Sequence, residues 1–86
     1  MKTVYKYPLY MGYTSLTVGG LNARPVKFGM QFDQMYVWVE HETMGGTTPL
    51  SFTIVGTGHS IGTDYKHVET IFDGDYVWHL YYRHGL

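Results

Sequence analysis

Apolar side chains along this chain recur mainly at every second position. That spacing is typical of strands, because successive side chains of a strand point to opposite faces of a sheet. No window of about 11 residues or more carries a clear amphipathic-helix repeat, so we expect no long helix. Seven segments are predicted to be strands: Lys2 to Tyr7, Thr14 to Val18, Pro25 to Phe32, Met35 to Glu42, Leu50 to Val55, His67 to Phe72 and Asp75 to Tyr82.

The third and fifth of these segments alternate most clearly. In the third, one face carries Val26, Phe28, Met30 and Phe32, and the other carries Lys27, Gly29 and Gln31. In the fifth, the apolar Leu50, Phe52 and Ile54 alternate with Ser51 and Thr53. We expect both to be half-buried strands whose apolar faces begin the core.

Two tight turns are predicted between neighbouring strands. Asp73-Gly74 lies between the sixth and seventh segments, and an Asp-Gly pair tolerates the positive φ angles of a type I′ turn. A hairpin is therefore expected there. Asp33-Gln34 is placed to close a second hairpin, although this pair suits a primed turn less well.

Two predicted strands are apolar on both faces. In one, Tyr36 and Trp38 oppose Met35, Val37 and Val39; in the other, Tyr76, Trp78, Leu80 and Tyr82 oppose Val77, His79 and Tyr81. A strand that is apolar on both faces is covered on both. Without a helix, the second cover is either the edge loops of another sheet or a partner subunit. We favour a partner subunit, because contiguous exposed apolar surface usually marks an interface.

These elements predict an all-β fold: a small sandwich or barrel of about seven mainly antiparallel strands, in a single domain of residues 1–86. A chain of 86 residues buries a modest share of its surface. It has no cysteine, so neither a disulfide nor a thiolate metal site reinforces the fold. A homo-oligomer is the expected additional support.

Charged residues are few and nearly balanced, with six Lys and Arg, seven Asp and Glu and a formal net charge of −1. A nucleic-acid surface needs clustered cations. Here the cations are scattered along the sequence: Lys2, Lys6, Arg24, Lys27, Lys66 and Arg83. We therefore expect no nucleic-acid partner. No apolar run reaches the ~18 residues that cross a bilayer, so we expect no membrane partner and a cytoplasmic location.

The segment Ile54 to Gly62 differs from its neighbours because three of its residues are glycines, which allow positive φ and the close approach of a ligand. Four residues in it are candidate ligand contacts: Thr57, Gly58, His59 and Ser60. Their backbone N–H groups, hydroxyls and imidazole suit an anion. The alternative is a strand connection in which the glycines serve geometry and His59 is hydrogen-bonded to the backbone.

No catalytic or metal-binding pattern is recognisable. His59 and Ser60 are adjacent, which seldom suits a base and its nucleophile, and no strand-to-helix elbow holds Ser60. The five histidines show no metal-ligand spacing. We expect neither an enzyme nor a cofactor. His79 is expected to be a buried or interfacial histidine that is satisfied by a hydrogen bond.

Further candidate contacts lie outside the loop. The Gln31 amide, beside the small Gly29, either recognises a polar ligand edge or faces solvent. Trp38, Trp78 and Tyr76 are candidate stacking groups for a planar ligand.

Several segments together resemble a family of small phage and prophage proteins of unknown function. They are Lys2 to Pro8, Val26 to Trp38 with its Gln31 and Trp38, Phe52 to Ile61, Glu69-Thr70 and Val77 to Leu80. The resemblance covers nearly the whole chain, and its most specific part is Thr57-Gly58-His59 after a strand. The family usually has Pro where Ser60 stands here, a departure that bears on loop rigidity and ligand choice.

The phage resemblance implies a protein of the host cytoplasm that counters host defence. The near-neutral charge argues against mimicry of DNA, whereas aromatic rings, hydroxyls and a glycine loop suit a pocket for a nucleotide-derived signalling molecule, shared between subunits. We expect ligand contacts from Thr57, Gly58, His59, Ser60, Gln31, Trp38 and Trp78. A direct inhibitor of a host defence protein and a structural or assembly phage protein are the alternatives.

Overall fold

All seven predicted segments form strands in the computed structural model, which describes residues 1–85. The strands are β1 (Lys2–Leu9), β2 (Gly12–Val18), β3 (Arg24–Gln31), β4 (Gln34–Glu42), β5 (Thr48–Gly56), β6 (Lys66–Asp73) and β7 (Tyr76–His84). Every strand pair is antiparallel, and residues 1–85 contain no helix. The predicted all-β class is confirmed.

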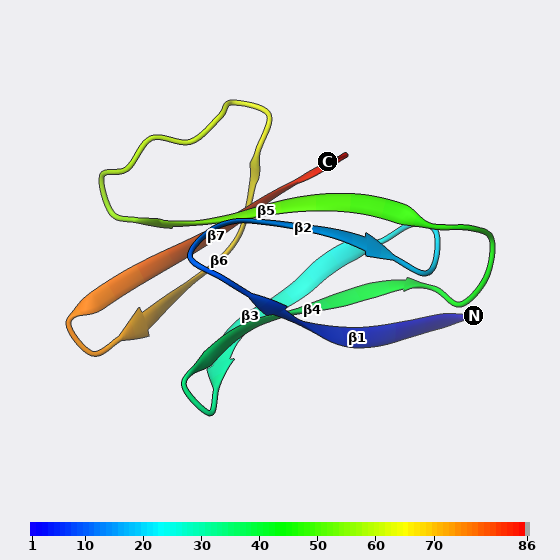
Figure 1. Cartoon of the computed structure of the whole chain (residues 1–86), viewed down its shortest axis with the longest axis horizontal. Coiled ribbons are helices and arrows are strands. Elements are labelled where there is room, and N and C mark those ends of the chain that lie inside the picture. Colours follow the sequence, from blue (N-terminus) through cyan, green and yellow to red (C-terminus); the bar gives the residue numbers. More distant parts are fainter. Residues whose placement is uncertain (86) are drawn as a thin grey trace.

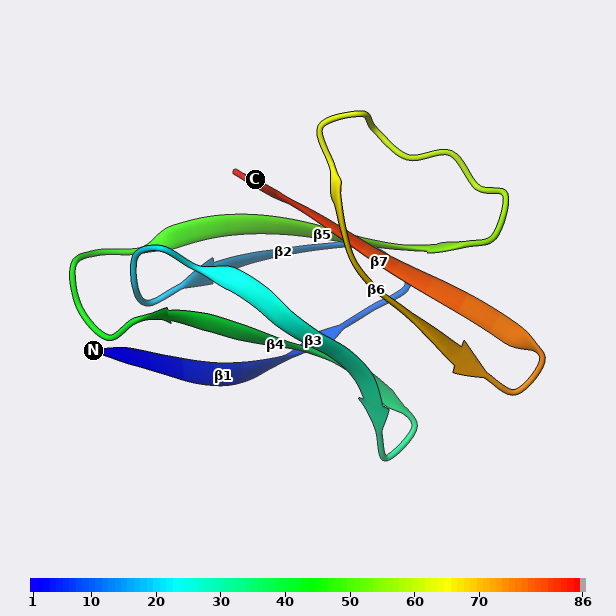
Figure 2. The ribbon, with the colours of Figure 1, turned by 180° about the vertical axis from the view of Figure 1, so that it is seen from behind.

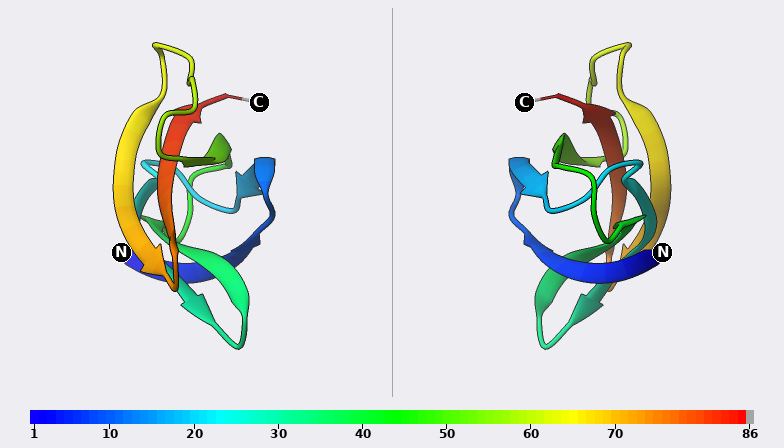
Figure 3. Two further views of the ribbon diagram at one scale, coloured as in Figure 1. Left: turned by 90° about the vertical axis from the view of Figure 1, so that its left-hand side faces the viewer. Right: turned by 90° about the vertical axis from the view of Figure 1, so that its right-hand side faces the viewer.

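The strands form two sheets that pack as a sandwich (Figure 1). Sheet A has the strand order β1-β4-β3, and sheet B has the order β2-β5-β7-β6. The chain passes from sheet A to sheet B after β1, returns for the β3–β4 hairpin and then completes sheet B, as the view from behind in Figure 2 also shows. The end-on views in Figure 3 show the two sheets facing each other.

The core lies between the inner faces of the two sheets. Its buried apolar side chains are Leu9, Val18, Ala23, Phe28, Val37, Val39, Leu50, Phe52, Ile54 and Leu80. The apolar face of β5 is therefore buried as predicted. Ser51 and Thr53 on its other face are buried too, because β5 is an interior strand and Thr53 stands between its cross-strand partners Tyr13 and Tyr81.

Strand β3 does not alternate as cleanly as its sequence predicts. Of its four expected inner side chains, only Phe28 is fully buried. The register with β4 shifts at Val26, which is the extra residue of a β-bulge and is 42% exposed. Phe32 lies beyond the strand, in the turn. The expectation of one continuous apolar face was therefore wrong, because a bulge interrupts the period of two.

A second bulge lies on β6, where the register with β7 shifts at Val68. Beside it, the carboxylate of Glu69 reaches from sheet B to β3 in sheet A. Its Oε1 accepts a hydrogen bond from the Phe28 N–H at 2.8 Å, and its Oε2 accepts one from Lys27 Nζ at 2.7 Å. Glu69 thus gives an edge-strand N–H a partner and joins the two sheets.

The ionised form of Glu69 is favoured in the folded protein. Burial raises the pKa of this carboxyl, but hydrogen bonds from Lys27 and the Phe28 N–H, together with the positive charge of Lys27 and the proximity of His67, outweigh burial and hold the pKa below its ordinary value. A lowered folded pKa contributes stability above the unfolded-state pKa of about 4.3, and that stability is lost as the pH falls through the folded pKa.

Both predicted hairpins form, but each turn is displaced by one residue from its expected position. Phe32 and Asp33 are the central residues between β3 and β4, with φ angles of 52° and 62°, as in a type I′ turn. Gly74 and Asp75 are the central residues between β6 and β7. Only Gly74 has a positive φ, of 59°, so this turn has the pattern of type II′ rather than the predicted type I′.

Replacing Glu69 with Ala should lower the free energy of unfolding at neutral pH by about 2 kcal/mol, because the Phe28 N–H and Lys27 lose their shared acceptor. The difference should shrink at about pH 3, where the unaltered carboxyl also loses its charge. Urea unfolding at both pH values measures the effect, with Asp75→Ala in the exposed turn as control. An equal loss at both pH values would contradict the role of the ionised carboxylate.

Candidate functional site

The loop between β5 and β6 begins by folding back on the last residue of β5. The Gly56 N–H donates to His59 Nδ1 at 3.2 Å, and the His59 N–H donates to the Gly56 carbonyl at 3.2 Å. Because Nδ1 accepts a hydrogen bond, the proton of the neutral ring lies on Nε2. The backbone bond considered as the alternative role of His59 is therefore present, and Nε2–H remains a donor group of the ring.

His59 lines a pocket of about 470 Å³ that we call the loop pocket. Its lining residues are Gly56, Thr57, His59, Asp75, Tyr76, Val77 and Trp78. The rings of Tyr76 and Trp78 are stacked, with centroids 5.5 Å apart and planes inclined by 13°. Gly56 permits this arrangement, since a Cβ there would lie 3.3 Å from His59 Cε1 and 3.8 Å from Trp78 Cζ3. The loop and the start of β7 therefore form one site.

The loop pocket is aromatic and polar but contains no permanent cation among the residues that line it. Its walls provide two flat rings, the Thr57 hydroxyl, the His59 imidazole and the exposed carboxylate of Asp75. These groups suit a planar ring with a hydrogen-bonding edge. A phosphate gains little inside the pocket, where Asp75 is the fixed charge.

A chain of hydroxyls and imidazoles anchors the start of the loop to sheet B. Thr57 Oγ1 lies 3.0 Å from His79 Nε2, and Thr70 Oγ1 lies 2.8 Å from His79 Nδ1. His67 Nε2 extends the chain, 2.9 Å from Thr70 Oγ1. The hydrogen bonding predicted for His79 is present, on a side chain that is half-buried rather than buried. A shallow depression of about 240 Å³ adjoins this chain and includes Gly58 in its lining.

Within one protomer the predicted ligand residues do not all meet. Thr57, His59 and Trp78 line the loop pocket, and Gly58 lines the adjoining depression. Ser60 is exposed and lines neither.

The other two predicted contacts lie on sheet A, on the face turned away from the core. Gln31 is at the end of β3, where its Oε1 accepts a hydrogen bond from Lys6 Nζ at 2.9 Å. Trp38 is in the middle of β4, between the buried Val37 and Val39. The strand order therefore separates Gln31 and Trp38 from the loop.

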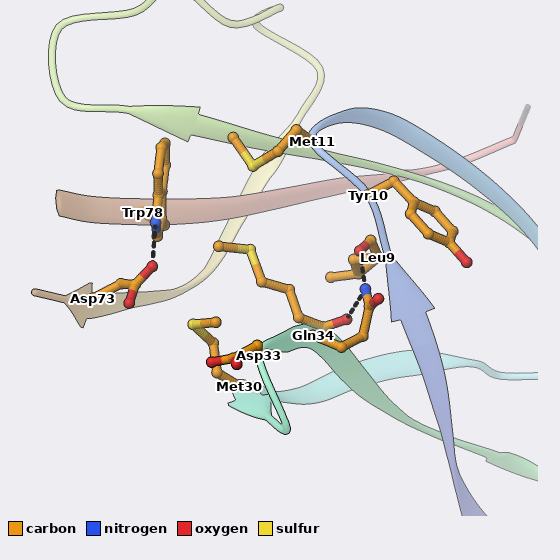
Figure 4. A pocket seen from close by; sticks show the side chains of 9 residues that line it. Leu9, Tyr10, Met11, Met30, Asp33, Gln34, Asp73 and Trp78 are labelled. Atoms are coloured by element: carbon orange, nitrogen blue, oxygen red, sulfur yellow. Dashed lines mark hydrogen bonds between the residues drawn. The ribbon is translucent and has the colours of Figure 1, made fainter.

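A second cavity, which the sequence did not indicate, shares Trp78 with the loop pocket (Figure 4). It has a volume of about 330 Å³ and is lined by Leu9, Tyr10, Met11, Met30, Asp33, Gln34, Met35, Asp73 and Trp78. Trp78 Nε1–H donates to Asp73 Oδ2 at 3.4 Å, and Gln34 Nε2–H donates to the Leu9 carbonyl at 2.7 Å. Three of the chain's five methionines gather here from separate elements, a proximity that sequence spacing does not reveal.

No group of three or more His, Asp or Glu side chains within residues 1–85 is arranged to hold a metal ion. Nor does this part of the chain contain a helix of the length and hydropathy needed to cross a membrane.

Comparison with known proteins identifies a family without identifying an activity. Neither a curated protein nor a solved structure matches the chain significantly. A family model described as a domain of unknown function, DUF7352, matches residues 1–85. The chain therefore belongs to the DUF7352 family, whose function is unknown.

Proposed function

We propose that this protein is a non-enzymatic binder of a nucleotide-like small molecule, whose base lies in the loop pocket. The stacked Tyr76–Trp78 pair beside Thr57 and His59 is the observation that carries this proposal. Aromatic faces hold a planar base by stacking, and a few fixed polar groups at the edge select it. The hydrogen bond that Gly56 gives to His59 fixes the imidazole before a ligand arrives.

The polar groups of the loop pocket match the edge of a base better than a phosphate. Nε2–H of His59 donates to a ring nitrogen or carbonyl, and the Asp75 carboxylate accepts from an amino group. Because no Lys or Arg lines the pocket, the phosphates extend away from it. In this proposal a neighbouring subunit contacts the phosphates, so that a homo-oligomer completes the binding site.

One end of the sandwich supports the oligomer. Phe32 and Phe72, in or next to the two hairpin turns, are 94% and 81% exposed, and Tyr10 and Met11 are exposed beside them around the methionine cavity. Contiguous exposed apolar surface of this kind marks an interface. Phe32 also has a positive φ, which is costly for a bulky side chain and indicates that its ring is kept at the tip for contact.

We propose that this binder acts in the host cytoplasm and sequesters a nucleotide-derived signal of host defence, a role that the resemblance to phage and prophage proteins supports. Sequestration needs binding without turnover. The exposed aromatic end also suits the second candidate, direct inhibition of a host defence protein.

Binding to the loop pocket is tested by calorimetric titration with cyclic mononucleotides, cyclic dinucleotides and ADP-ribose derivatives. His59→Ala should weaken binding of the recognised nucleotide by about tenfold, because a hydrogen bond between neutral groups contributes about 1 kcal/mol or somewhat more. Tyr76→Ala should weaken it similarly by removing the exposed half of the stacked pair. Both variants should keep the thermal stability of the parent.

Ser60→Ala is the matched control, since Ser60 neighbours His59 but lines neither pocket. Equal affinity of the parent and the His59 and Tyr76 variants would refute the assignment of the loop pocket. Absence of binding across the whole nucleotide panel would refute the proposed function.

Phe32→Asn should reduce the oligomeric mass in native mass spectrometry, because it removes the ring from the exposed end. In the separated protomer the same change should raise the free energy of unfolding by about 1 kcal/mol, since Asn adopts positive φ more readily than Phe. Met44→Ser, at the opposite end of β4 and equally open to solvent, is the control and should keep the parent's mass. An unchanged mass for Phe32→Asn would contradict an interface at this end.

A further inference from the structure

The outer face of sheet A gathers cations that are far apart in the sequence. Strand β4 lies between β1 and β3, so Trp38 has Lys6 as its cross-strand partner on one side and Lys27 on the other. Directly opposed residues of antiparallel strands point to the same face of a sheet. The two lysines therefore flank the indole.

Two further cations lie on this face, nearer the other end of β4. Lys2 Nζ is 3.1 Å and an Arg24 guanidinium nitrogen is 3.3 Å from the carboxylate of Glu40. The register thus places four of the six Lys and Arg residues on this face, but only two of the seven Asp and Glu residues, Glu40 and Glu42. Glu69 also reaches Lys27 from sheet B, so three carboxylates meet these four cations and the face keeps a small positive excess within a chain whose net charge is −1.

Two aromatic rings occupy the centre of the same face. The centroids of Tyr36 and Trp38 are 6.2 Å apart, with planes inclined by 56°, and both side chains are half-buried. Lys6 Nζ lies 4.4 Å from the centre of the Tyr36 ring. Gly29 is beside them and has no side chain; a Cβ there would lie 3.7 Å from Trp38 Cζ3 and 3.9 Å from Lys27 Cε.

We propose that the outer face of sheet A is a binding surface for single-stranded nucleic acid. Unpaired bases stack on Trp38 and Tyr36, and the phosphates that connect them lie against Lys6, while Lys27 keeps its bond to Glu69. A positive surface that carries exposed rings is the combination by which proteins hold single strands, since each base offers a π-face and each linkage a negative charge. A duplex hides its base faces, so the surface favours single strands.

Charge complementarity favours this occupant over a second copy of the chain. A symmetric contact through sheet A would bring the same surface of two protomers together. The positive excess of one protomer's face would then meet the same excess on its partner, which opposes the contact. A polyanion gains from the same positive excess and releases counterions as it binds.

This surface is separate from the loop pocket, so the inference goes beyond the proposed small-molecule function. The sequence argued against a nucleic-acid partner because its cations are scattered along the chain. The strand order removes that objection, because it pairs residues 6 and 27 with residue 38.

The test is fluorescence anisotropy of labelled oligo-dT and oligo-rU of about 12 nucleotides, a length within the usual range of single-strand site sizes. The parent protein should bind them, with a log affinity that falls linearly with log salt. Lys6→Gln should weaken binding several-fold and reduce the salt slope by about 0.7, the value expected for one lost contact to a single-strand phosphate. Lys66→Gln, the same charge change on an exposed strand end of sheet B, should leave both quantities near those of the parent.

Two variants at Trp38 separate stacking from support of the fold. Trp38→Leu should weaken binding by about tenfold or more, as expected for the loss of one stacked base, whereas Trp38→Phe keeps a ring and should retain most of the affinity. Circular dichroism identifies any variant that is unfolded. If a Trp38 variant is misfolded, the comparison of Lys6→Gln with Lys66→Gln tests the proposal instead.

Three results would overturn the inference. The first is no binding of either oligonucleotide at low salt. The second is a result that shows unspecific attraction to charge. Such a result is either equal loss of oligonucleotide affinity in Lys6→Gln and Lys66→Gln, or equal affinity of the parent for the single strand and a matched duplex. The third is a change in oligomeric mass for Trp38→Leu with unchanged oligonucleotide affinity, which would assign this face to a second copy of the chain.

Discussion

The carboxylate of Glu69 is the contact on which the arrangement of the two sheets depends. At one edge of the sandwich the short connection between β1 and β2 joins the sheets covalently. At the other edge β3 and β6 lie against each other without a backbone ladder between them. Both strands carry a bulge there, and Glu69 bonds the Phe28 N–H and Lys27 across the seam. One edge is closed by the chain itself and the other by a single ionised side chain.

Alternation along β7 explains how the loop acquires its shape. Trp78 points to the inner side of sheet B and His79 to the outer side, so neighbouring residues face different surroundings. Gly56 is the cross-strand partner of Trp78 and starts the loop that returns His59 to the indole, while Thr57 crosses to His79. Contacts on both faces of β7 therefore hold the loop in place.

The fold was largely predictable from the sequence, because apolar residues recur mainly at every second position. Its departures are local. A bulge exposes Val26. Each hairpin turn is displaced by one residue, so that Phe32 and Gly74 are the first central residues of the two turns. Both departures depend on how a strand pairs with its partner strand. Such effects are tertiary and leave no mark in the alternation of one segment.

The site was only partly predictable, for the same reason. The glycines of residues 54–62 predicted an irregular loop after a strand, which the structure contains between β5 and β6, and Trp78 lies beside it. Trp38 and Gln31 were grouped with it by residue type alone, whereas strand order assigns them to the other sheet. The methionine cavity and the pairing of Lys6 and Lys27 around Trp38 depend on topology, which sequence spacing does not encode.

The placement of the two tryptophans has a practical consequence. The chain contains two of them, one in sheet A beside the lysines and one in sheet B at the wall of the loop pocket. Indole emission depends on the immediate surroundings of the ring, so each candidate surface contains its own intrinsic optical reporter. A protein that retains a single tryptophan thus reports occupancy of one surface without an attached dye, and quenching assigns a bound molecule to its sheet.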